Sequence, residues 1–166
     1  MNTFVKFAFA AAVSLGALQA APALAVCAPS PYQGLNIPPV TYVGSVTAAQ
    51  NIRLYPGSSI VSPNGVYRLI FQGDGNLVLY KNGTQPEWAT DTQICYEPLS
   101  TTMPLYTRFQ SDGNLVVYHS NVNNPLVEHD VWDVNKQGNP NAVLRVQDDG
   151  NVVIYNGTKA IWARTW

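Results

Sequence analysis

Three short segments of the sequence carry the same polar side chains at the same offsets. They read QGDGNLVLY (72–80), QSDGNLVVY (110–118) and QDDGNVVIY (147–155). Each offers a carboxylate that only accepts hydrogen bonds, two side-chain amides that donate and accept, and a phenol hydroxyl on a flat apolar ring. A valine adds an aliphatic contact. This set suits a neutral ligand with vicinal hydroxyl groups beside an apolar C–H surface, as on a sugar ring.

A purely structural role explains only part of this pattern. Aspartate and asparagine side chains often bond their own backbone in tight turns, which would account for Asp-Gly-Asn. It does not account for the glutamine two residues before the aspartate, or the tyrosine four residues after the asparagine, in all three copies. We therefore interpret the three segments as ligand sites.

The elements that position these side chains are predicted to be β-hairpins. An Asp-Gly pair flanked by alternating apolar residues is a strong hairpin signal. The glutamine would end one strand, and the asparagine, valine and tyrosine would lie along its partner. The segments start 38 and 37 residues apart, which indicates three copies of one supersecondary unit. After the N-terminal leader no helical apolar period is present, so the predicted fold is all-β.

A central core should hold the three units together. Each hairpin is followed by a tryptophan, at Trp88, Trp132 and Trp162. Short sheets that cannot bury an apolar face alone must pack against one another. Side chains alternate between the faces of a strand, so one set should point inward with the tryptophans: Leu77, Leu79, Leu115, Val117, Val152 and Ile154. The asparagine, valine and tyrosine of each motif should then face outward.

The chain begins with the features of a secretory signal peptide. Lys6 precedes an apolar run over 7–18, and Ala23-Leu24-Ala25 supplies the small residues of a cleavage site. The run is too short to span a bilayer, so we expect no membrane insertion. We expect cleavage after Ala25 and secretion, with the periplasm as the destination if the source is bacterial. Residues 26–40, which include four prolines, should form an extended arm before a domain over 41–166.

The charge of the chain limits the classes of partner to expect, and its cysteines predict a disulfide. Loss of Lys6 with the leader leaves eight basic residues against ten acidic ones, which gives no electrostatic reason to expect nucleic acid or anionic lipid. Cys27 and Cys95 are the two cysteines of the chain, and in an oxidising compartment they should form one disulfide.

Catalysis and metal binding are both disfavoured. A glycosidase places two carboxylates around one bond, whereas each motif contributes one aspartate. The third motif contains two adjacent acids, Asp148 and Asp149. In a strand the Asp148 side chain should point to the opposite face from Asp149. Calcium loops need several acidic ligands close together. His119 with Glu128-His129-Asp130 forms a richer cluster, which we expect in a solvated loop. The sequence thus predicts no enzyme, no metal and no cofactor.

Two arginines lie near the motifs. Arg108 and Arg145 each precede a motif glutamine by two residues and should share its face of the strand. One interpretation is a surface ion pair with a neighbouring aspartate, which contributes little. The other is a contact to an acidic or extended glycan.

The repeated Q-x-D-x-N-x-V-x-Y closely resembles the sugar-binding motif of the bulb-type (monocot mannose-binding, snowdrop-like) lectins. The resemblance covers about residues 41–166, and Leu54-Tyr55-Pro56-Gly57 and Trp88-Ala89-Thr90 are similar to that family too. It implies a β-prism II fold, with three four-stranded antiparallel sheets around a pseudo-threefold axis. It also implies one metal-independent mannose site on each sheet.

The resemblance assigns a role to each motif residue. Asp74 and Asn76 would bond the 2-hydroxyl of mannose, Gln72 the 3-hydroxyl and Tyr80 the 4-hydroxyl, with Val78 against the ring. The same roles would fall to Gln110, Asp112, Asn114, Val116, Tyr118, Gln147, Asp149, Asn151, Val153 and Tyr155. The implied partners are mannose-containing glycans or polysaccharide, with a homodimer left open. An antibacterial lectin-like protein, or a relative acting through protein contacts, is the alternative.

Two departures from the family pattern bear on the sites. Family members often carry a cysteine within the first motif, paired with one near Cys95. Gly75 occupies that position here, so Cys95 is assigned to Cys27. The second repeat also has 14 residues from Tyr118 to Trp132, against 8 and 7 in the other two. This insertion is expected to alter or cover the second site.

Overall fold

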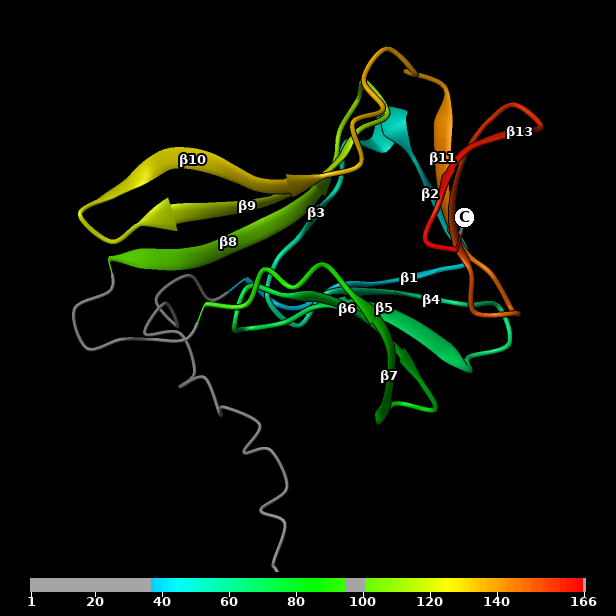
Figure 1. Ribbon diagram of the computed structural model, residues 1–166, viewed down its shortest axis with the longest axis horizontal. Coiled ribbons are helices and arrows are strands. Elements are labelled where there is room, and N and C mark those ends of the chain that lie inside the picture. The colour runs from blue at the N-terminus through cyan, green and yellow to red at the C-terminus, as the bar shows by residue number, and fades with distance from the viewer. Residues whose placement is uncertain (1–36, 95–100, 166) are drawn as a thin grey trace, which may run out of the picture.

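The computed structural model describes residues 37–94 and 101–165. The signal peptide, residues 26–36 of the arm and both cysteines lie outside the described residues. Within them the chain forms one short 3₁₀ turn, η1 (Ala48–Gln50), and strands in three sheets (Figure 1). The strands are β1 (Thr41–Val43), β2 (Ser45–Thr47), β3 (Arg53–Leu54), β4 (Ser59–Val61), β5 (Tyr67–Phe71), β6 (Leu77–Lys81), β7 (Gln85–Ala89), β8 (Thr102–Phe109), β9 (Leu115–Asn121), β10 (Asn124–Asp133), β11 (Ala142–Val146), β12 (Val152–Asn156) and β13 (Lys159–Ala163).

The predicted three-sheet, all-β architecture is confirmed, with one difference in the first sheet. The second sheet has the order β10-β9-β8-β3 and the third β13-β12-β11-β2, with four antiparallel strands each. The first has five, in the order β1-β4-β5-β6-β7, because β1 pairs in parallel with β4. Gly44 follows β1 with a φ of +73°, which a residue without Cβ adopts readily. The chain turns there and enters β2, in another sheet.

The core lies between the three sheets, as the alternation predicted. The inward residues of the hairpin strands are buried, among them Leu69, Leu79, Leu115 and Ile154. The three tryptophans pack against this core and against one another in edge-to-face pairs. Their ring centroids are 5.8 Å (Trp88–Trp132), 6.1 Å (Trp88–Trp162) and 6.2 Å (Trp132–Trp162) apart. A nearly equilateral triangle of rings is what a pseudo-threefold arrangement requires.

The insertion of the second repeat is a strand rather than the predicted loop. Residues 124–133 form β10, which pairs with β9 through two irregularities of register. With β8 the two strands extend away from the body of the molecule (Figure 1). β10 is exposed along almost its whole length, including Leu126 at 92%. No helix in the described part of the chain is long and apolar enough to cross a membrane.

Candidate functional site

Each motif forms one tight hairpin turn with the same backbone hydrogen bonds. The glutamine N–H donates to the asparagine carbonyl at 2.8, 2.8 and 2.9 Å in the three copies. The N–H of the turn glycine donates to the glutamine carbonyl at 3.1, 3.0 and 3.0 Å. These glycines, Gly75, Gly113 and Gly150, have φ values of +87° to +89°, where a side chain would be strained. The turns therefore present the motif side chains with one geometry.

The first and last motif residues meet in every copy. The glutamine Nε2 donates to the tyrosine hydroxyl at 3.1 Å for Gln72–Tyr80, 2.6 Å for Gln110–Tyr118 and 3.1 Å for Gln147–Tyr155. This bond joins the end of one strand to the middle of its partner. It fixes a side-chain amide and a phenol hydroxyl beside each other on the outer face, as the sequence predicted.

The motif aspartates accept a hydrogen bond within the turn and can still accept another from a ligand. In each copy one carboxylate oxygen accepts the backbone N–H of the motif asparagine, at 3.0, 3.0 and 2.8 Å. The turn role considered from the sequence is thus real. The second oxygen of Asp74, Asp112 and Asp149 accepts no bond from the described residues, so each carboxylate can still accept a hydroxyl hydrogen.

The asparagine side chains have three different environments. Asn76 Oδ1 accepts from the Thr90 hydroxyl at 3.0 Å and the Thr92 N–H at 3.3 Å. Asn114 Oδ1 accepts from the Lys136 N–H at 3.0 Å, and its Nδ2 donates to Asp133 at 3.3 Å. Asn151 Oδ1 is buried and finds no partner among the described residues.

A common rule underlies the first two environments. The backbone donor follows the tryptophan of its repeat by four residues in both, at Thr92 and Lys136. In the third repeat that position is residue 166, outside the described part of the chain.

The motif valines lie on the outer face but are covered. Val78, Val116 and Val153 do not belong to the core cluster, yet only 4, 3 and 2% of their surface is exposed. The sequence predicted that these valines face outward and supply an aliphatic contact for a sugar ring. They instead form the floor beneath the flanking side chains, and a ring contact would need those side chains to move aside.

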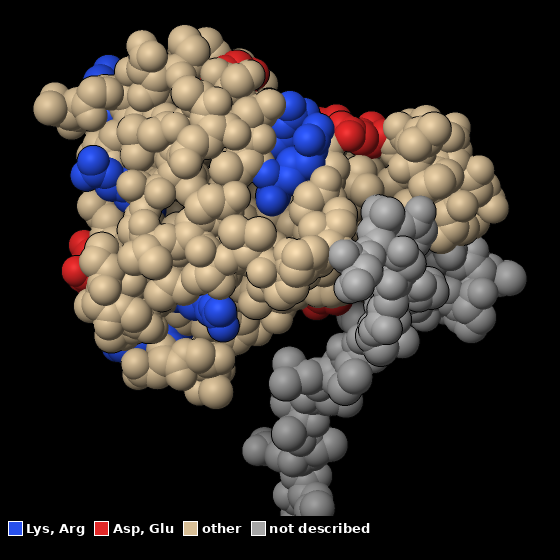
Figure 2. All heavy atoms as spheres, turned by 180° about the vertical axis from the view of Figure 1, so that it is seen from behind, with Lys and Arg blue, Asp and Glu red and all other residues tan. Residues whose placement is uncertain are grey.

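The insertion changes the surroundings of the second site. Asp130 lies opposite Tyr118 in the register of β9 and β10. Burial raises the pKa of the Tyr118 hydroxyl, and the carboxylates of Glu128 and Asp130 add to this while Arg108 opposes it. Figure 2 shows Lys and Arg atoms directly beside Asp and Glu atoms at the base of the lobe formed by this hairpin. The second site therefore has charged side chains of both signs around its tyrosine.

The remaining sequence candidates have structural partners. Arg108 Nε donates to Asn51 Oδ1 at 2.9 Å, and the Arg145 guanidinium lies over the Tyr155 ring, 5.4 Å from its centroid. Asp148 accepts the Asn64 N–H at 2.9 Å. In the described residues no three His, Cys, Asp or Glu side chains lie close enough to hold a metal ion.

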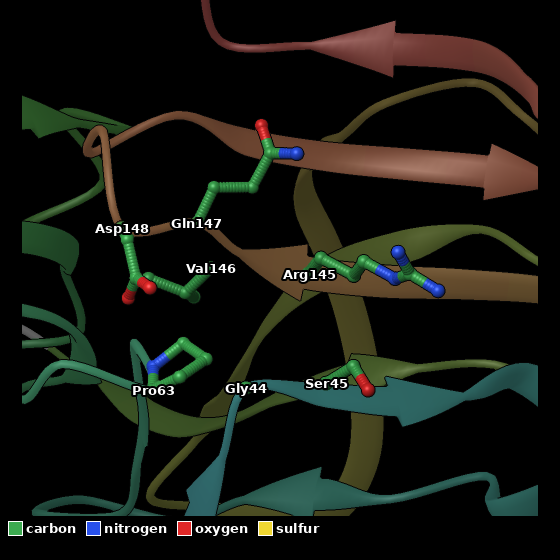
Figure 3. Close-up of a pocket in the computed structure, with 7 residues that line it drawn as sticks. All are labelled: Gly44, Ser45, Pro63, Arg145, Val146, Gln147 and Asp148. Carbon is green, nitrogen blue, oxygen red and sulfur yellow. The ribbon is translucent and has the colours of Figure 1, made fainter.

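A hollow beside the third motif was not foreseen from the sequence. It has a volume of about 330 Å³ and lies where β2 and the β4–β5 turn approach the end of β11 (Figure 3). Gln147, Arg145 and Asp148 line one side of it, and Ser45 and Pro63 the other. Its walls come from segments about 100 residues apart, so no local pattern could indicate it.

Comparison with known proteins identifies relatives of this architecture. No protein-family model matches the chain. Over 44 residues it is 48% identical to the B-type lectin plumieribetin of Scorpaena plumieri, a stretch that spans 26% of the chain and 37% of that protein's length. The Japanese Marasmius oreades lectin shares the fold, with a TM-score of 0.59 at 24% identity over 77% of this chain and 96% of its own.

Two further solved structures are similar in both sequence and fold. A lectin from Allium sativum is 35% identical, with a TM-score of 0.53 over 72% of this chain and 97% of its own. A monomeric monocot mannose-binding lectin from Gastrodia elata is 31% identical, with a TM-score of 0.53 over 74% and 95%. Together with the three sheets and the repeated hairpin motif, these relatives show that the chain belongs to the bulb-type (B-type) mannose-binding lectins, a non-enzymatic family with the β-prism II fold.

Proposed function

We propose that this protein is an exported lectin that binds mannose-type glycans through its three motifs, without a metal ion. The observation that carries the proposal is the group repeated on each outer face. In each motif a glutamine amide is bonded to a tyrosine hydroxyl, and the aspartate two residues after the glutamine has one oxygen that accepts no bond from a described residue. Such a group supplies donors and acceptors for neighbouring sugar hydroxyls, since each sugar hydroxyl both donates and accepts.

Within each site the roles follow the order of the motif. The uncommitted aspartate oxygen and the asparagine amide bind the 2-hydroxyl, the glutamine the 3-hydroxyl and the tyrosine the 4-hydroxyl. The valine is the floor of the site and contacts the ring once the side chains that flank it move aside. The Tyr118 hydroxyl, whose pKa burial raises further from its ordinary value, is a donor as well as an acceptor in the second site.

The sites are shallow, and that sets how the protein works. Each lies on the outer face of a sheet, where one sugar buries little surface, so we expect monovalent dissociation constants in the millimolar to high micromolar range, about −4 to −6 kcal/mol. Three outward faces around one axis can engage several chains of a dense polysaccharide. Multivalency then raises the apparent affinity roughly 10²–10⁴-fold without new contacts. A second copy of the chain in a homodimer would add to this effect.

Calorimetric titration with methyl α-D-mannoside tests the site assignment. The variant with Tyr80→Phe, Tyr118→Phe and Tyr155→Phe removes only the hydroxyls. It should weaken binding by about 1–3 kcal/mol per site because a polar partner of the sugar is lost. Asn151→Ala probes the third site alone, because Asn151 belongs to that motif. The matched control is Asn123→Ala, an exposed asparagine on the β9–β10 hairpin.

The measured affinities distinguish a sugar-binding site from a turn whose polar side chains have only a structural role. Unchanged mannoside affinity in the triple tyrosine variant, with the fold intact by circular dichroism, would show that the motifs do not bind the sugar. Equal loss in Asn123→Ala would show that the effect is not specific to the motif.

A further inference from the structure

The position two residues before the motif glutamine differs among the three repeats. It holds Ile70 in the first, Arg108 in the second and Arg145 in the third. Each pairs directly across the hairpin with the motif valine of its own repeat, Val78, Val116 or Val153. Opposite residues of an antiparallel pair share one face, so this position adjoins the sugar site in every repeat. The first site therefore has an apolar neighbour there, and the other two have a guanidinium.

Arg108 already donates a hydrogen bond within the protein. Its Nε donates to Asn51 Oδ1 at 2.9 Å. Glu128 and Asp130 of β10 lie close enough to act on Tyr118, as Arg108 does. The positive charge at the second site is thus offset by carboxylates, and part of its donor capacity is used.

Arg145 is held in place but keeps its donors. Its guanidinium carbon lies 5.4 Å from the centroid of the Tyr155 ring, a cation–π contact that restrains the side chain beside the site. Tyr155 in turn accepts the bond from Gln147. Arg145 donates no hydrogen bond to a described residue, so its planar set of N–H groups is available to a ligand.

The hollow beside the third site gives a ligand room on this side. Gln147 of the motif lines this hollow (Figure 3). Arg145 of β11 and Ser45 of β2, which are partners in the sheet, line it too. Asp148 also lines it. Its carboxylate accepts the Asn64 N–H, and in Figure 3 it points away from the Arg145 guanidinium. The cationic end of the hollow is therefore separate from its acidic end.

We propose that the third site prefers a mannose unit that carries a carboxylate at carbon 6, a mannuronate, over neutral mannose. This inference rests on the proposed function, in which Tyr155 binds the 4-hydroxyl. Carbon 6 is attached to carbon 5, next to carbon 4, so its substituent lies close to the hydroxyl of Tyr155, and Arg145 lies over the ring of that tyrosine. A guanidinium binds a carboxylate through two parallel hydrogen bonds, which a hydroxymethyl group cannot match. The natural ligand class is then an acidic polysaccharide containing mannuronate.

NMR spectra of the intact ¹⁵N-labelled protein report the three sites separately. Each site has its own side-chain amide signal, from Gln72, Gln110 or Gln147. The probes are methyl α-D-mannoside and methyl α-D-mannosiduronate, which differ only at carbon 6. At low salt the dissociation constant read from Gln147 should be about fivefold lower for the uronide, the upper range for an ion pair partly exposed to water. The ratio should approach one at 0.5 M NaCl because salt screens the charges. Gln72 should show no preference for the uronide.

Variants assign the effect to Arg145. Arg145→Ile gives the third site the residue type of the first and should abolish the uronide preference at Gln147. Arg145→Lys should keep part of it, since the charge remains without the planar donor pair. Arg108→Ile is the matched control and should leave the preference at Gln147 unchanged.

The outcomes distinguish this inference from the proposed function. If neither probe shifts the three glutamine signals, the proposed function is wrong. If methyl mannoside binds while Gln147 shows no preference for the uronide, or keeps one in Arg145→Ile, the mannuronate inference alone is overturned.

Discussion

Replacement of Gly113 by alanine should destabilise the second hairpin far more than a glycine change in an open turn. Gly113 has a φ of +88°, and an added Cβ would lie 2.9 Å from Asn139 Cβ and also against the Asn139 backbone. Gly83 has a similar φ of +78°, but nothing lies within 4 Å of its added Cβ. The pair therefore separates backbone strain from a clash between the second turn and the segment that leads to β11.

The magnitude follows from these two terms. A non-glycine residue with positive φ costs roughly 1–2 kcal/mol, which is the whole effect expected for Gly83→Ala. Gly113→Ala adds the displacement of backbone in a packed region, about 1–3 kcal/mol more. For a domain of this size about 1 kcal/mol corresponds to some 4 °C in Tm, so Gly113→Ala should melt about 4–12 °C below Gly83→Ala.

Thermal and urea unfolding of both variants measure the difference. Because the same turn carries Asp112 and Asn114, NMR of Gly113→Ala should also show the Gln110 signal losing its response to mannoside while Gln72 and Gln147 retain theirs. Equal melting temperatures for the two variants would refute the close approach of the second turn to Asn139.

Four other outcomes are expected. Trp132→Ala should lose about 3–5 kcal/mol in urea unfolding because it removes one ring of the central triangle, and a loss below 1 kcal/mol would contradict that packing. Burial lowers the pKa of His119 from its ordinary 6.5, so the unfolded state takes up a proton at a higher pH than the folded state does. The free energy of unfolding should therefore be highest above about pH 6.5 and fall as the pH drops below it, and His119→Gln should remove that part of the pH dependence of Tm. Intact mass of the exported protein should show cleavage after Ala25 and a gain of two hydrogens on reduction, and two free thiols before reduction would exclude the Cys27–Cys95 disulfide. Binding to immobilised mannan should be much tighter than to methyl mannoside and indifferent to a chelator, and loss of binding with the chelator would reveal a metal.

The parts of the fold that follow from local sequence could be predicted. Each Asp-Gly turn specifies its own hairpin, and the alternation of strands such as Leu77-Val78-Leu79 specifies which residues face the core. The tryptophan after each repeat then predicts the shared interior. These signals act over a few residues, so they can be identified without knowing where the rest of the chain goes.

What the sequence did not reveal depends on distant partners. Residues 41–54 form three very short strands in three different sheets, and none has a pattern that selects its neighbour. The polar insertion was predicted to be a loop, yet β9 supplies a partner along which it becomes β10. The different partners of Asn76 and Asn114 come from the segments that follow Trp88 and Trp132, outside the motif itself.

The distribution of β1, β2 and β3 over three sheets has a consequence for the order of folding. Ser45 pairs with Arg145, so β2 has no partner in the third sheet until about 100 further residues have emerged. Contacts this distant carry a high loop-closure cost and slow folding. A chain that folds as it emerges would leave β2 without its partner for the longest time, which makes this strand the part most in need of protection from misassembly.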